Sequence, residues 1–403
     1  MKQPVKRRRF VQMASSGLAV GAAGCLGGES GDGEADPDDG DESDETADHG
    51  ERTGSSGLAY AFGPNTIALI DPEAGEVVDE LTEGVDGYEY GDAVLTDDGS
   101  ELFVIEETLT QVLVIDTETR TIVDEVPMGP DGTHMYHPNA DEMWAHSDAE
   151  GTFYVIDTDS HEVVETVAVG LEGEGHGKLL SHADLGSVGY ATNVNDPAAH
   201  VVDLDAYERT GSIELGEEGG THYKAYSPAN GLAYFEYGDV TAVVDTDTDE
   251  VVDELDVAGG MYLTPSGDRM SIVDHGEIHV FDVTGEDTVS IGSVAVDDGP
   301  DALAYHEHDG TRYGFTANTM AATATVVDVD ELEVVEHIDA GDIERPEDAH
   351  HLHRSGVSGD GYFFTPADGD GTVAVIDMTA RELVAHVPVE DGVDTVQYVP
   401  ASE

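Results

Sequence analysis

The chain lacks the features that define several common protein classes. It has 403 residues and a single cysteine, Cys25, so it cannot form a disulfide framework. Lysine and arginine total 15 against 88 aspartate and glutamate residues, which gives a formal net charge of −73. Such a field repels phosphates and excludes binding to nucleic acid through a basic surface. The longest apolar run, residues 13–26, is too short and too rich in glycine and alanine to span a bilayer, which excludes a multi-span membrane protein.

The acidic residues are spread along the whole chain rather than gathered in one segment. Self-repulsion of this size destabilises a compact fold at ordinary salt, whereas at molar salt the Debye length falls to about 3 Å. The few basic residues are mostly arginine, and only four are lysine: Lys2, Lys6, Lys178 and Lys224. This composition resembles that of proteins from halophilic archaea, and we interpret the charge as salt adaptation. A specific acidic surface for cations or a basic partner is the alternative.

The first 25 residues are typical of an export signal. The run Arg7-Arg8-Arg9-Phe10-Val11 resembles a twin-arginine motif, and an apolar stretch follows it. That stretch ends at Ala22-Ala23-Gly24-Cys25, which resembles a lipobox whose thiol accepts lipid. We therefore expect export by the Tat route and a lipid anchor on the outer face of the cytoplasmic membrane. Residues 26–57, rich in Gly, Asp, Glu and Ser, are expected to be a disordered acidic tether.

Residues 58–403 contain one sequence motif that recurs eight times, and we call it a phrase below: an apolar strand that ends in aspartate. In Phe153-Tyr154-Val155-Ile156-Asp157 the strand is followed by a polar turn and a second apolar strand. Successive phrases end 37 to 49 residues apart, and four short strands per period predict a β-propeller. We expect an all-β fold with eight blades, or seven if one phrase belongs to an irregular insertion. The eight aspartates are Asp71, Asp116, Asp157, Asp203, Asp245, Asp282, Asp328 and Asp377.

The two ends of this region are expected to share one blade. Residues 58–62 and 67–81 provide strands b, c and d, and residues 394–399 provide a lone strand a that closes the ring. The phrase Val155-Ile156-Asp157-Thr158 with the following Val163-Val164 resembles the YVTN-type propeller repeats. That resemblance covers residues 58–399 and implies the fold but almost nothing about activity.

Histidine is unusually frequent, with 18 residues. Four of them occur where strand a begins, after a glycine- or acid-rich connection. Strand a is the innermost strand of a propeller blade, so its first residues line the mouth of the central channel and converge there. These four are His134, His176, His222 and His350. The first three belong to consecutive blades, whereas His350 comes from across the ring and would serve a second site or the far wall.

Other polar residues are expected at the same mouth because strand b runs antiparallel to strand a. The candidate ligands from the ends of strand b are His146, His275 and Glu106, and Asp92 is a further candidate from the blade before that of His134. Imidazoles and carboxylates together suit zinc, and copper or nickel would accept the same set. A second histidine group is expected on the opposite face, as surface or turn residues: His137, His182, His306, His308 and His353.

The glycine-preceded histidines of an exported propeller resemble the AztD-like periplasmic zinc metallochaperones. The matching stretches are Gly132-Thr133-His134, Glu174-Gly175-His176 and Gly220-Thr221-His222. The resemblance implies a non-enzymatic zinc carrier that hands the metal to the solute-binding protein of an ABC importer. Two alternatives stay open. One is a non-catalytic interaction propeller at the cell surface, and the other is a lactonase-like hydrolase with calcium held by Glu106, Asn193 and Asn318.

Overall fold

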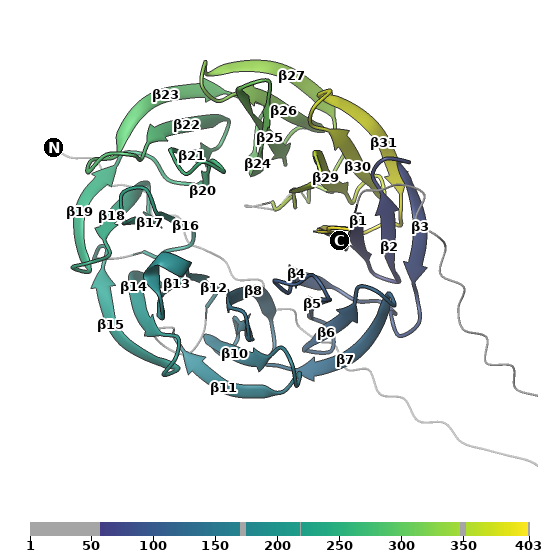
Figure 1. Ribbon diagram of the computed structural model, residues 1–403, viewed down its shortest axis with the longest axis horizontal. Helices are drawn as coiled ribbons and strands as arrows, with labels where there is room; N and C mark the ends of the chain where they lie inside the picture. Colours follow the sequence, from purple (N-terminus) through teal and green to yellow (C-terminus); the bar gives the residue numbers. More distant parts are fainter. Residues whose placement is uncertain (1–56, 170–174, 218, 347–351, 402–403) are drawn as a thin grey trace, which may run out of the picture. The chain divides into compact units, whose positions relative to one another are not determined.

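Eight four-stranded antiparallel sheets make up the fold, one for each repeated aspartate, and they surround a central channel as the blades of a propeller (Figure 1). The computed structural model describes residues 57–169, 175–217, 219–346 and 352–401. Cys25, the export signal, the acidic tether up to residue 56 and His350 lie outside these residues. The prediction of an all-β propeller with eight blades is confirmed, and the seven-bladed alternative is wrong.

Each blade runs from an innermost strand a to an outermost strand d (Figure 1). In this order, blade 1 has β32 (Thr395–Val399), β1 (Leu58–Gly63), β2 (Thr66–Asp71) and β3 (Glu76–Leu81). Blade 2 has β4 (Tyr90–Leu95), β5 (Glu101–Glu106), β6 (Gln111–Asp116) and β7 (Thr121–Pro127). Blade 3 has β8 (Gly132–Asn139), β9 (Glu142–Ser147), β10 (Thr152–Asp157) and β11 (Val163–Ala168). Blade 4 has β12 (Gly177–Leu180), β13 (Val188–Asn193), β14 (Asp196–Asp203) and β15 (Glu208–Glu214).

The second half of the ring repeats this pattern. Blade 5 has β16 (Lys224–Ser227), β17 (Leu232–Tyr237), β18 (Val240–Asp245) and β19 (Glu250–Leu255). Blade 6 has β20 (Gly260–Leu263), β21 (Arg269–Asp274), β22 (Glu277–Asp282) and β23 (Val289–Ala295). Blade 7 has β24 (Pro300–His308), β25 (Thr311–Asn318), β26 (Thr323–Asp328) and β27 (Glu333–Asp339). Blade 8 has β28 (Val357–Gly359), β29 (Tyr362–Ala367), β30 (Thr372–Asp377) and β31 (Glu382–Pro388).

The described chain contains a single short helix, the 3-10 helix η1 (Ala183–Leu185). Within the described ranges, no helix combines the length and the apolar content that a bilayer crossing needs. The regular structure that positions any site is therefore the set of strands.

The ring closes by pairing the two ends of the folded region. β32 pairs antiparallel with β1, with Val396 opposite Ala61, so the last strand completes the first blade as predicted. The innermost strands of successive blades contact each other around the ring, including β28 with β32 and β32 with β4. Closure leaves no blade without neighbours on both sides, which fixes the innermost strands against one another.

The repeated aspartate at the end of strand c accepts hydrogen bonds from the backbone of the turn that follows. The Asp116 carboxylate accepts the backbone N–H of Thr119 at 2.6 Å, and Asp245 accepts that of Thr248 at 3.0 Å. The fourth residue after Asp116, Arg120, then adopts a left-handed backbone with φ of 57°. The carboxylate thus holds the tight turn into strand d, which explains why the apolar phrase ends in this residue type.

The hydrophobic core is divided among the gaps between neighbouring blades. Trp144 and Phe153 of blade 3, for example, pack in one cluster with Leu179 and Ala191 of blade 4. A blade cannot bury both of its faces alone, so this packing requires its neighbours. The core therefore lies away from the channel axis, and polar side chains of the innermost strands are free to face the channel.

Candidate metal centre

Three histidines from consecutive blades meet at the channel. His134 lies in β8, His176 directly precedes β12, and His222 lies two residues before β16. The Nε2 atoms of His134 and His176 are 2.9 Å apart, and those of His176 and His222 are 3.0 Å apart. We call these three residues the His triad. Among the residues that the structure describes, it is the one group of three or more His, Cys, Asp or Glu side chains whose ligand atoms converge, all within 4.8 Å.

Two carboxylates fix the orientation of the triad imidazoles. Nδ1 of His134 lies 3.0 Å from Oδ2 of Asp92, and Nδ1 of His176 lies 2.7 Å from Oδ2 of Asp148. An ionised carboxylate only accepts hydrogen bonds, so each Nδ1 carries the proton and each Nε2 keeps a lone pair. The lone pairs of His134 and His176 then face each other across 2.9 Å. A metal ion or a shared proton between the two nitrogens would turn this repulsion into attraction.

The electrostatics of the site keep His134 and His222 neutral and the supporting carboxylate Asp148 charged. Burial lowers the pKa of His134 to about 4, against the opposing effect of Asp92. Burial and the nearby Lys178 charge also lower the pKa of His222. Burial alone would raise the pKa of Asp148, but hydrogen bonds from His146 and His176 hold it well below its usual range. Neutral imidazoles backed by carboxylates are the state in which histidine binds metals.

The glycines before these histidines are required by the backbone. Gly175 has φ of 121°, a conformation that residues with a side chain rarely adopt. A Cβ on Gly220 would lie 1.7 Å from the carbonyl oxygen of Val194. The close approach of the chain at these points brings the histidines to the channel, and it explains the glycine-rich connections that precede strand a.

The other predicted ligands take different places. Asp92 touches the triad through Nδ1 of His134 rather than as part of the converging group. His146 is fully buried, and its Nδ1 lies 2.9 Å from Oδ1 of Asp148, the carboxylate that also holds His176. Asp148 was not predicted; its only signal in the sequence is its place directly after strand b and two residues after His146.

The structure does not bring Glu106 or His275 to the triad. The Glu106 carboxylate is buried in the β5–β6 turn, where it accepts the backbone N–H groups of Thr108 and Leu109, each at 2.8 Å. The His275 side chain is 99% exposed and pairs with Asp274. Both residues end or follow a strand b as expected, but local turn geometry directs their side chains elsewhere.

The calcium set of the hydrolase alternative is also dispersed. Asn193 is buried, and its side chain donates to the carbonyl of Gly175 at 3.1 Å. Asn318 is buried too and donates to the hydroxyl of Thr325 at 3.0 Å. Together with Glu106, these side chains serve turns within their own blades.

The prediction of the propeller face on which His353 lies is wrong. We expected it on the face opposite the triad, but β28 begins only at Val357, so His353 precedes strand a rather than ending it. Its Nδ1 lies 3.4 Å from Oδ2 of Asp301, and its charge contributes to the lowered pKa of His222. His353 therefore lies on the triad side of the channel.

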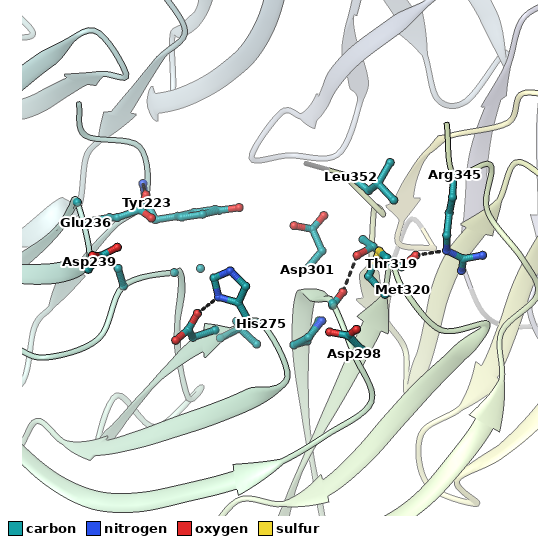
Figure 2. Close-up of a pocket in the computed structure, with 18 of the residues that line it drawn as sticks. Tyr223, Glu236, Asp239, His275, Asp298, Asp301, Thr319, Met320, Arg345 and Leu352 are labelled. Atoms are coloured by element: carbon teal, nitrogen blue, oxygen red, sulfur yellow. Dashed lines mark hydrogen bonds and ion pairs between the residues drawn. The ribbon is translucent and has the colours of Figure 1, made fainter. Parts of the chain in front are cut away.

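A cavity of about 820 Å³ adjoins the triad and is lined by blades 5 to 8 (Figure 2). Tyr223 belongs to both features, because it lines the cavity and its ring centroid lies 4.4 Å from that of His222. Figure 2 shows the Tyr223 ring and the Asp301 carboxylate projecting into the space. Burial raises the pKa of the lining residue Glu236. The charged groups that line the cavity are mostly acidic.

Comparisons with known proteins support the fold. No protein-family model and no curated protein sequence matches the chain. Among solved structures, the dihydro-heme d1 dehydrogenase NirN aligns with a TM-score of 0.66 at 13% identity, over 86% of this chain and 75% of that chain. AztD from Citrobacter koseri aligns with a TM-score of 0.63 at 12% identity, over 86% of this chain and 98% of that one. Apo AztD from the same organism aligns with a TM-score of 0.61 at 12% identity, over 87% of this chain and 100% of that chain. At these identities, the similarity establishes the propeller fold alone.

Proposed function

We propose that the protein is an extracytoplasmic carrier that binds zinc at His134, His176 and His222. The observation that carries this proposal is the convergence of the Nε2 lone pairs, with the tautomers of two rings set by Asp92 and Asp148. Zinc binds imidazole nitrogens at about 2.0–2.1 Å in tetrahedral sites, which places ligand atoms about 3.3 Å apart. The Nε2 separations of 2.9 and 3.0 Å are close to that spacing. Copper or nickel would accept the same ligands.

The site suits a carrier better than a permanent structural metal. Three protein nitrogens leave a fourth position open, whereas structural zinc sites are closed by four protein ligands. The triad is also reachable from solvent, because the side chains of His134 and His176 are 16% and 27% exposed. An incoming ligand can therefore bind the metal before the histidines release it.

The receiving partner proposed here is the solute-binding protein of a metal ABC importer. The resemblance to AztD-like metallochaperones supports this choice, and the cavity beside Tyr223 offers room for side chains of a docked protein. The export signal and Cys25 would place the carrier on the outer face of the membrane, attached by lipid only. Replacing Cys25 by alanine should move the protein from the membrane fraction to the soluble fraction of its source cells.

Calorimetry and elemental analysis test zinc binding directly. The wild-type chain should bind one zinc ion tightly, and the triple variant His134→Ala/His176→Ala/His222→Ala should lose that site. His308→Ala is the matched control, because His308 is a surface residue beside Asp309. Unchanged zinc affinity in the triple variant contradicts the proposal. Protein from metal-replete medium that contains calcium, or no metal, would instead favour the hydrolase or the interaction module.

A transfer assay tests the carrier role. Zinc-loaded protein is mixed with the metal-free solute-binding protein, and the rate of metal movement is compared with zinc loss to a small chelator. Direct hand-over requires transfer that is faster than spontaneous dissociation and that rises with partner concentration. Equal rates would leave a zinc-binding protein with no hand-over.

A further inference from the structure

Two of the four lysines in the chain lie directly beside the His triad. Lys178 and Lys224 are the only lysines in the described residues, and each follows a triad histidine by two positions. Residues two apart on an extended strand face the same side, so both side chains point into the channel like the histidines. Lysine is the scarcest charged residue of the chain, and both described lysines lie beside the triad.

Both ammonium groups are held over tyrosine rings. Lys178 Nζ lies 5.0 Å from the ring centroid of Tyr223 in the next blade. Lys224 Nζ lies 5.0 Å from the ring centroid of Tyr136, which belongs to blade 3, whereas Lys224 belongs to blade 5. The Lys224 side chain must therefore pass in front of β12 in blade 4. The two lysine amines form a layer one step along the channel from the triad, positioned by the contacts with the tyrosine rings. Burial lowers the pKa of Lys224 to about 7, so a bound anion would also favour its charged form.

Neither ammonium has a carboxylate partner. No hydrogen bond or ion pair joins Lys178 or Lys224 to any described residue, although both side chains are half-buried. The acids that influence Lys178 electrostatically are engaged elsewhere. Asp92 accepts from His134 and Met135, Asp301 accepts the backbone N–H of Arg354, and Glu236 accepts that of Tyr223.

Neither Nζ atom is among the fully buried polar atoms of the described residues, so water can reach both and a bound anion could take the place of that water. Six N–H donors, three on each lysine, point into a channel whose neighbouring acids are already used. An anion with several oxygens would satisfy these donors. It would also separate the ammonium charges from a divalent metal ion in the triad, which they would otherwise repel.

We propose that Lys178 and Lys224 form an oxyanion-binding subsite, and that its occupant is a carboxylate or a small inorganic oxyanion. This oxyanion would also supply the fourth ligand of the zinc ion, a step that rests on the proposed zinc site. The cargo would then be a metal–oxyanion pair rather than a bare cation. The His triad and the two lysines would then act together to select this pair over other metals and other anions.

Lysine-selective NMR tests the oxyanion site without any metal. A chain labelled with carbon-13 at lysine Cε gives at most four signals, and Lys2→Arg/Lys6→Arg removes those outside the described residues. Metal-free protein is titrated with acetate and, separately, with sulfate, while chloride keeps the ionic strength constant. Saturable shifts of both remaining signals support the site. Shifts with acetate alone assign a carboxylate, and shifts with sulfate alone assign an inorganic oxyanion; no shift with either anion overturns the inference.

Zinc calorimetry then tests the coupling between the anion and the metal. The saturating anion should tighten zinc binding roughly tenfold in the wild-type chain. Lys178→Gln should abolish this anion dependence, and Lys178→Arg, which keeps the charge, should preserve it. Zinc binding that ignores the anion overturns the coupling and leaves the carrier proposal intact. NMR shifts without any zinc binding would overturn the carrier proposal and leave the oxyanion site.

Discussion

Asp148 is a single carboxylate that orients two imidazoles. Its Oδ1 lies 2.9 Å from Nδ1 of His146, and its Oδ2 lies 2.7 Å from Nδ1 of His176. His146 is fully buried and holds the carboxylate from behind, while His176 is the central member of the triad. The supporting residues therefore decide which nitrogen of His176 is available to a metal.

Replacing Asp148 should weaken zinc binding although the residue touches no metal. Asp148→Asn removes the charge that fixes the His176 tautomer, and we expect zinc affinity to fall about 10- to 100-fold. Competition calorimetry against a chelator of known affinity measures the change. Asp159→Asn, at an exposed turn position of the same blade, should bind zinc like the wild type. Equal affinities for the two variants would show that Asp148 does not orient the ligand.

Glu107 should make stability fall as pH rises. Burial, together with the charges of Glu89 and Asp394, raises the pKa of Glu107 to about 7. The folded state then holds a proton that the unfolded state releases, so the stabilising effect is full below the unfolded pKa near 4.5 and is lost as pH rises through about 7. Glu107→Gln should therefore unfold at a higher temperature than the wild type at pH 8 and show little advantage at pH 5.

The control for this pH experiment is Glu83→Gln, a substitution at an exposed position. It should follow the wild-type melting temperature at both pH values. Molar salt will weaken the contributions of Glu89 and Asp394, but it leaves the burial effect in place. A melting-temperature difference that is the same at pH 5 and pH 8 would contradict the assignment to Glu107.

The site was partly predictable from the sequence, and the reason differs from residue to residue. The position of the triad follows from the repeat, because residues at one phase of strand a converge wherever blades form a ring. Glu106 and His275 share the phase of strand b, but turn hydrogen bonds and, in His275, a φ of 45° redirect their side chains. Asp148 and the cation–π contacts of Lys178 and Lys224 join residues of different blades, and no pattern along the chain records such contacts.

At the scale of the strands, the fold can be predicted from the sequence because each strand c ends in an aspartate. It combines a buried apolar strand with a turn that its own carboxylate holds, so one short phrase marks both the strand and its end. Blade number, strand order and ring closure follow from counting these phrases, and the structure confirms each of them. The exact strand ends and the late start of β28 do not follow, because they depend on contacts with neighbouring blades.

Removing one turn carboxylate should destabilise the fold without changing the site. Asp116→Ala deletes the acceptor for Thr119 in blade 2, and we expect a loss of about 1–2 kcal/mol in the free energy of unfolding. Asp116→Asn keeps an acceptor and should lose less. Urea unfolding at fixed molar salt measures both variants, and calorimetry should give wild-type zinc affinity for each. Equal losses for the two variants would show that the acceptor is not what matters.

At the scale of the whole molecule, the effect of the negative charge on stability depends on the salt concentration. With a formal charge of −73 on 403 residues, long-range repulsion opposes the compact state unless salt screens it. We expect the melting temperature to rise steeply between about 0.1 M and molar potassium chloride, where the Debye length falls from about 10 Å to about 3 Å. Sodium chloride of equal ionic strength should act alike if screening is the cause. A response to only one of the two cations would indicate specific binding instead.

Salt should also distinguish zinc binding at the proposed metal site from zinc binding to the acidic surface. At low salt, scattered carboxylates attract zinc by charge alone, so calorimetry should show several weak events besides one strong event. Molar potassium chloride screens these exposed attractions, whereas bonds from three imidazole nitrogens to the metal are short-range and survive. The isotherm should therefore simplify to a single site as salt rises. The triple His134→Ala/His176→Ala/His222→Ala variant should show the converse, with weak events at low salt and none at molar salt. Loss of the strong event along with the weak ones would mean that the acidic surface, and not the triad, is what holds zinc.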